Sequence, residues 1–119
     1  MRPLIFSTAQ PPINMAWTRF ILHKMKLMHE QRQQLHQMSQ QLQHAIIEKG
    51  FESPSTSQII PVILGDSQLA LDRAEKLQQS GFYVLPVRPP TVQMGSSRLR
   101  ICMNTQLNQD ELEGLIQRL

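Results

Sequence analysis

The sequence predicts a mixed α/β (α+β) fold, in which a long N-terminal helix precedes a small β-α-β-β-α domain with its helices on one face of a short sheet. The long helix is expected because residues 14–49 contain neither glycine nor proline. Short apolar or alternating runs further along indicate strands. Two amphipathic stretches that follow helix-capping residues supply the remaining helices. Such a pattern is most simply satisfied by two packed layers.

The first half of the chain is expected to form an arm and a helix. Pro11 and Pro12 fix an extended backbone, so residues 1–13 are assigned to an extended arm. Residues 14–50 are assigned to a connecting helix that Gly50 terminates. Its apolar stripe comprises Trp17, Ile21, Met28, Leu35 and Leu42, widened by Met25, Met38, Ala45 and Ile46.

The partial heptad spacing of this stripe leaves two interpretations open. The stripe packs against the sheet of the same chain or another domain, or it forms a coiled-coil seam with a partner. Lys24 and Gln31 occupy intervening positions of the heptad pattern, which favours the first interpretation.

Residues 51–119 are expected to form the small C-terminal domain. Its first strand is Ile59–Leu64, a short apolar run that follows a polar loop. Asp66 is the expected N-cap of the next helix, which ends at Gly81. The apolar face of this helix consists of Ala70, Ala74 and Leu77.

Two further strands and a final helix complete the domain. The strands are expected at 82–87 and 98–103, with alternate residues of the second on opposite faces. Asn108 and Glu111 resemble a capping box. The helix that follows has an apolar stripe of Leu112, Leu115, Ile116 and Leu119.

Composition excludes several functional classes. The net charge of +3 comes from scattered basic residues, so no nucleic-acid partner is expected. No apolar run is long enough for a membrane span, and no secretory signal is recognisable, so a cytoplasmic protein is the default. The single cysteine, Cys102, is expected to be a buried, inert thiol. No metal site is expected, because helical residues six to eight apart cannot share an ion; this applies to His23, His29, His36 and His44.

Residues 88–102 are the most informative segment. Pro89 and Pro90 favour an extended approach, Gly95 allows a tight turn, and a strand follows that carries Arg98 and Arg100 on one face. A guanidinium held on a strand suits the bidentate recognition of a carboxylate or phosphate. A strand arginine also often forms an ion pair at the surface. No acid/base pair or nucleophile accompanies it, so the segment predicts binding groups and no catalytic residue.

Three blocks of the chain are distinctive: Arg2 to Pro12, Ile60 to Asp66 (IPVILGD), and Arg88 to Arg100 (RPPTVQMGSSRLR). Together they resemble the α-oxoamine synthase family of pyridoxal-phosphate-dependent acyltransferases. The resemblance implies the C-terminal domain of a fold-type I pyridoxal-phosphate enzyme. It also implies condensation of an amino acid with an acyl-CoA by a homodimer; the third block favours the members that join alanine to pimeloyl-CoA for biotin synthesis.

The resemblance also implies roles for individual residues. Arg100 would bind the carboxylate of the amino acid, and Thr91 would contact substrate near the acyl group. Ser7 and Thr8 would reach the cofactor phosphate of the partner subunit.

The chain departs from the family in its lysines. None lies in the Gly/Ser-rich context of the Schiff-base lysine; they are Lys24, Lys26, Lys49 and Lys76. We therefore expect an inactive fragment that does not bind the cofactor covalently. Glycine C-acetyltransferase, 5-aminolevulinate synthase and a non-catalytic helical interaction module are the alternatives.

Overall fold

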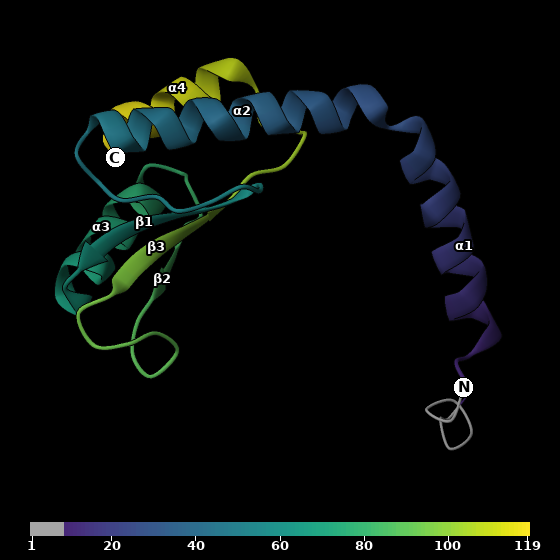
Figure 1. The fold of residues 1–119 in the computed structure, drawn as a ribbon, viewed down its shortest axis with the longest axis horizontal. Coiled ribbons are helices and arrows are strands. Elements are labelled where there is room, and N and C mark those ends of the chain that lie inside the picture. The colour runs from purple at the N-terminus through teal and green to yellow at the C-terminus, as the bar shows by residue number, and fades with distance from the viewer. Residues whose placement is uncertain (1–8) are drawn as a thin grey trace. The chain divides into compact units, whose positions relative to one another are not determined.

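The structure, a computed structural model, describes residues 9–119. The helices and strands of this part follow one another in the order α1-α2-β1-α3-β2-β3-α4 (Figure 1). The bounds are α1 Pro12–Leu27, α2 His29–Glu48, β1 Ile59–Gly65, α3 Ser67–Gln79, β2 Leu85–Val87, β3 Ser97–Cys102 and α4 Gln109–Arg118. The order after α2 is β-α-β-β-α, which confirms the predicted fold class.

The helix expected over 14–50 is present as two helices. Met28 separates them, with φ −95° and ψ 45°, and its backbone N–H donates to the carbonyl oxygen of Met25 at 3.2 Å. The absence of glycine and proline permits a continuous helix without enforcing one, because helices in proteins are stabilised mainly by packing. No residue of α1 is buried.

The chain divides into two compact units, Met1–Glu30 and Gln31–Leu119. The first contains α1, and the second contains most of α2 and every element after it. The finer division into 1–13, 14–50 and 51–119 stays a prediction.

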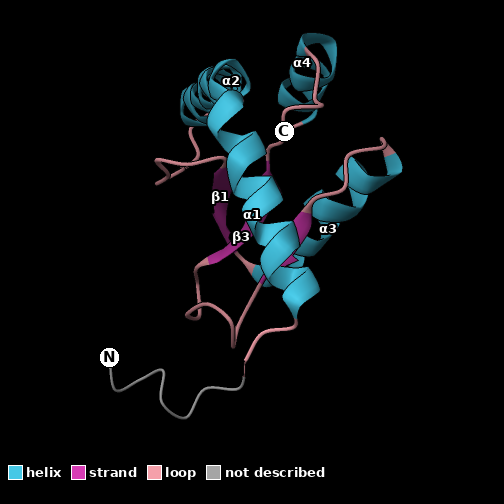
Figure 2. Cartoon of the chain, turned by 90° about the vertical axis from the view of Figure 1, so that its right-hand side faces the viewer, coloured by secondary structure: helices cyan, strands magenta, loops and turns pink. Residues whose placement is uncertain are grey.

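The sheet of the second unit is antiparallel, with β3 in the centre between β1 and β2. Arg98, Leu99 and Arg100 of β3 each pair with both edge strands, and Arg100 lies opposite Pro61 on β1 and Leu85 on β2. Figure 2 shows the strands in magenta and the helices in cyan. Because β3 is central, side chains on its outward face have neighbours from strands on both sides.

Alternation along the strands separates a core face from an outward face. Ile60 and Val62 of β1 and Leu99 and Ile101 of β3 are buried, and they lie opposite one another in the ladder. Helices α2, α3 and α4, together with Leu119 directly after α4, complete this core; the helix residues are Met38, Leu42, Ile46, Ala74, Leu77, Leu112 and Leu115. The predicted alternation of β3 residues between two faces is therefore confirmed.

Both predicted helix caps are present. The Asp66 carboxylate accepts from the backbone N–H of Leu69 at 2.8 Å. At α4, the Asn108 side chain accepts from the backbone N–H of Glu111 at 2.9 Å. The Glu111 carboxylate accepts from the N–H of Asn108 at 3.0 Å, which completes the capping box.

Two local expectations were wrong. The strand expected over 82–87 covers only Leu85–Val87, because the N–H of Phe82 donates to Leu77 at the end of α3 and Val84 turns into the core. Cys102 is exposed, not buried. Its apolar neighbours in sequence suggested burial, but the alternation of β3 places it on the outward face with Arg100.

The apolar stripe of the predicted long helix is buried or partly buried on α2 and mostly exposed on α1. Leu42 is fully buried and Leu35 is partly buried in the core of the second unit, so neither is available for a coiled-coil seam. On α1 the side chains of Trp17 and Phe20 are 63% and 56% exposed. No helix in the described range 9–119 is long and apolar enough to cross a membrane.

Candidate functional site

Arg100 lies at the middle of the outward face of the sheet. Its position on the central strand fixes the base of the side chain between two neighbouring strands. The residue is exposed, and its guanidinium makes no hydrogen bond or ion pair with any residue that the structure describes. All five of its N–H donors are therefore available to a ligand.

Two hollows meet at Arg100. The first, which we call the turn hollow, has a volume of about 440 Å³. It is lined by Pro54, Ser55, Thr56, Ser57, Ile59, Pro61, Val87, Arg98 and Arg100. These residues come from the outward face and from the polar segment before β1, which sequence reasoning had treated only as a loop. The three consecutive hydroxyl residues Ser55, Thr56 and Ser57 are the sequence signal from which this part of the site could have been predicted.

The second, which we call the loop hollow, has a volume of about 410 Å³. It is lined by β2, the segment that follows it, and Arg100; its residues are Leu85, Pro86, Val87, Arg88, Pro89, Pro90, Thr91 and Arg100. Pro90 follows a cis peptide bond, and the N–H of Thr91 donates to the carbonyl oxygen of Arg88 at 3.0 Å. The structure thus brings Arg100 and Thr91, the two predicted substrate contacts, to the same hollow.

The turn between the loop hollow and β3 is built as the sequence predicts. Gly95 has φ +76°, a conformation that L side chains rarely adopt. Ser96 closes the turn, because its N–H and its hydroxyl both donate to the carbonyl oxygen of Gln93, at 3.1 and 2.7 Å. Ser97, fully buried, lies 2.8 Å from the Ser67 hydroxyl at the start of α3. The first residue of β3 is therefore fixed to the rest of the domain.

The charged side chains that line the two hollows around Arg100 are all positive. Neither hollow is lined by an aspartate or glutamate, whereas the turn hollow has two arginines and the loop hollow has Arg88 in addition to Arg100. Unneutralised guanidinium groups attract anions, above all the planar oxygens of carboxylates and phosphates. Neither lining includes a histidine, a lysine or a carboxylic acid, so what these residues offer is the binding of an anion.

Two predicted site residues cannot be placed. Ser7 and Thr8 lie outside the described residues. Within residues 9–119, histidine, cysteine, aspartate and glutamate do not gather in any group of three or more that could hold a metal ion.

The comparison with protein families decides the classification. A sequence model described as aminotransferase class I and II matches residues 1–119. The chain belongs to the aminotransferase class I and II family. This family is dependent on pyridoxal phosphate, which confirms the cofactor class implied by the sequence blocks.

Relatives within this family have a consistent name. The chain is 46% identical over 117 residues to a putative 8-amino-7-oxononanoate synthase of Pasteurella multocida and 44% identical over 117 residues to the 8-amino-7-oxononanoate synthase of Haemophilus ducreyi. These matches cover 98% of the chain and 30% of each relative. The chain therefore spans about a third of the length of the relatives it matches, and its resemblance to this synthase is confirmed.

Solved structures of three enzymes share the fold of this chain. A Sphingomonas wittichii serine palmitoyltransferase matches with a TM-score of 0.83 and 26% identity, over 98% of this chain and 30% of that one. The S. paucimobilis enzyme, solved with a bound PLP–myriocin aldimine, matches over the same shares with a TM-score of 0.82 and 25% identity. An 8-amino-7-oxononanoate synthase from Francisella tularensis, at 23% identity over 98% of this chain and 34% of that one, shares the fold with a TM-score of 0.80.

Proposed function

We propose that this chain is the C-terminal part of a pyridoxal-phosphate-dependent 8-amino-7-oxononanoate synthase that condenses alanine with pimeloyl-CoA in biotin synthesis. The observation that carries the proposal is the unpaired guanidinium of Arg100, which shares the loop hollow with Thr91 and has no acidic neighbour there. In the proposed role, Arg100 binds the alanine carboxylate and Thr91 contacts substrate near the acyl group. The names of the relatives at 44–46% identity support this assignment.

The remaining parts of the proposal concern the complete enzyme. It is a cytoplasmic homodimer in which Ser7 and Thr8 contact the cofactor phosphate of the partner subunit. The cofactor supplies the electron sink for the carbon–carbon bond-forming step.

The described residues around Arg100 do not themselves fit a cofactor site. Neither hollow is lined by a lysine amine that could bind the cofactor or by an aromatic ring that could stack on it. Lys24 and Lys26 lie on α1, Lys76 lies on α3, and Lys49 directly follows α2. We therefore propose that the chain alone is inactive and forms no stoichiometric, borohydride-trappable adduct with pyridoxal phosphate.

A chimeric enzyme tests the proposed function. This chain replaces the matching segment of the Pasteurella multocida relative, and the rate of 8-amino-7-oxononanoate formation is measured against the concentrations of alanine and pimeloyl-CoA. We expect turnover, and we expect Arg100→Ala to raise the KM for alanine by about tenfold or more, as expected for the loss of a charge-assisted hydrogen bond.

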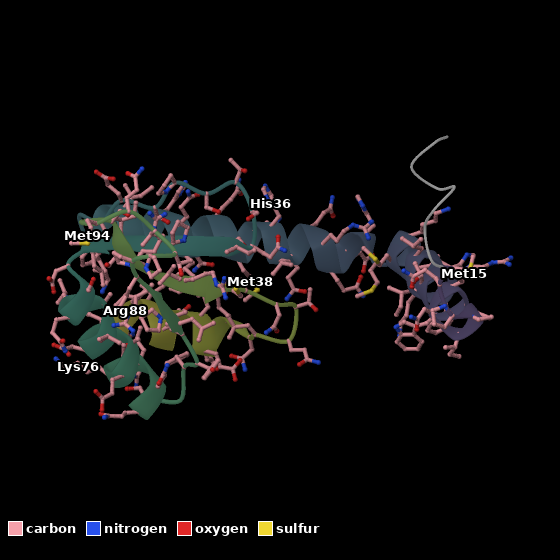
Figure 3. The ribbon with its side chains drawn as sticks, turned by 90° about the horizontal axis from the view of Figure 1, so that it is seen from below. Met15, His36, Met38, Lys76, Arg88 and Met94 are labelled. Carbon is pink, nitrogen blue, oxygen red and sulfur yellow. The ribbon has the colours of Figure 1, made fainter. Side chains whose placement is uncertain are left out.

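The matched control is Lys76→Gln, which removes one positive charge from α3 and should leave the KM for alanine unchanged (Figure 3). An active chimera whose KM for alanine is unaffected by Arg100→Ala would contradict the role of Arg100. A chimera that uses glycine with acetyl-CoA or succinyl-CoA, and not alanine with pimeloyl-CoA, would support glycine C-acetyltransferase or 5-aminolevulinate synthase.

A helical interaction module remains the candidate from another class. Leu35 and Leu42 pack in the core of the second unit, so such a module would have to use α1 instead. The exposed side chains of Trp17, Phe20 and Leu22 are the observation that favours it. Sedimentation of the chain with Trp17→Glu and Phe20→Glu distinguishes the two, because only the module requires a stable dimer that these changes abolish.

A further inference from the structure

The two hollows that meet at Arg100 differ in chemistry. Apart from Thr91 and the two arginines, the loop hollow is lined by aliphatic side chains and prolines. The turn hollow has three consecutive hydroxyl residues, Ser55, Thr56 and Ser57, and two guanidinium groups. A carboxylate needs several N–H and O–H donors, and the turn hollow supplies more of them.

Two of the three hydroxyl groups, those of Thr56 and Ser57, have an O–H that donates to no other residue within 9–119. The Ser55 hydroxyl is already used, because it donates to the carbonyl oxygen of Ile59 at 2.7 Å. The Ser57 Oγ accepts from the N–H of Ile59 at 3.2 Å, which positions this oxygen and leaves its proton free to donate. The Thr56 hydroxyl has no hydrogen-bond partner among residues 9–119.

Arg98 is held in place but is not neutralised. Its Nε–H donates to the carbonyl oxygen of Ser96 at 3.0 Å, which fixes the half-buried side chain along the strand. Its two terminal nitrogens make no hydrogen bond or ion pair within residues 9–119, and no acidic residue lines the hollow. Because Arg98 and Arg100 are two residues apart on one face of β3, their bases lie about 7 Å apart. An anion between these two positive charges lowers their mutual repulsion.

We infer that the turn hollow is the carboxylate subsite, in which Arg98, Thr56 and Ser57 bind the carboxylate together with Arg100, and that the loop hollow takes the apolar part of the second substrate. The identity of the carboxylate as that of an amino acid rests on the proposed function. The binding of a small carboxylate in the turn hollow is independent of the proposed function.

The test uses the 119-residue chain labelled with ¹⁵N, and it follows backbone amide signals during titration with acetate, with L-alanine and with L-alaninamide. Acetate and L-alanine should shift the signals of Thr56, Ser57 and Arg98, and L-alaninamide, which has no carboxylate, should not. Arg98→Gln should weaken acetate binding about fivefold or more, and Thr56→Val by a smaller factor. Lys76→Gln, the control of equal charge, should leave it within about twofold.

Three results would overturn the inference. They are acetate shifts confined to residues 85–91, equal shifts with L-alaninamide, and an unchanged acetate affinity in Arg98→Gln whose spectrum remains that of a folded protein.

The chimeric enzyme separates this inference from the proposed function. Acetate binding in the turn hollow together with an inactive chimera contradicts only the proposed function, whereas an active chimera whose KM for alanine is unchanged by Arg98→Gln contradicts only the subsite.

Discussion

At the residue scale, the direction of the Arg100 side chain follows from its place on the central strand. Residues of β3 alternate between the core and the outward face, so the burial of Leu99 and Ile101 requires Arg100 to point away from the core. The alternation was readable from the sequence, and it placed Arg98 and Arg100 on the same face. The hydroxyl donors of residues 55–57 could not be paired with this face from sequence, because their approach depends on the path of the loop before β1.

Cys102 provides a prediction at the same scale. Because it is exposed at the end of β3, the thiol of the native chain should react stoichiometrically with a thiol-specific chromogenic disulfide in the absence of denaturant. The absorbance of the released chromophore measures the reaction. Cys102→Ser should abolish it and leave the thermal midpoint of unfolding nearly unchanged. A thiol that reacts only in urea would contradict the assignment of Cys102 to the outward face.

At the element scale, helix ends were predicted more reliably than strand ends. Asp66 and Asn108 cap their helices through side chains close in sequence, so the signal is local. The start of β2 is decided instead by Val84 entering a core built from distant residues. The interruption at Met28 has no glycine, proline or capping residue to signal it.

The capping box of α4 supports a prediction of stability. Asn108→Ala removes the acceptor for the N–H of Glu111, and it should lower the free energy of unfolding by about 1 kcal/mol. Asn108→Ser, which keeps an acceptor oxygen, is the control and should cost much less. Urea denaturation followed by circular dichroism measures both. Equal losses in the two variants would show that the cap bond itself contributes little.

At the scale of the whole molecule, the division into two units predicts which part determines stability. The core consists of residues from Leu35 onward, and no residue of α1 is buried. Deletion of residues 1–28 should therefore change the free energy of unfolding by less than about 0.5 kcal/mol. The measurement is urea denaturation of both chains, and a loss above about 1 kcal/mol would contradict it. The shorter chain should also self-associate less, since Trp17 and Phe20 are removed.

The central place of β3 has a consequence for synthesis of the chain. Within the sheet, strands β1 and β2 pair with β3 and not with each other, and β3 is the last strand to leave the ribosome. Until Ser97–Cys102 has been translated, both earlier strands have apolar side chains and unpaired backbone groups with no partner in the sheet. A nascent chain that stops at the Gly95 turn would therefore contain the hydroxyl donors of residues 55–57. It would lack β3, and with it Arg98 and Arg100. Completion of the sheet and completion of the proposed anion site are therefore the same event.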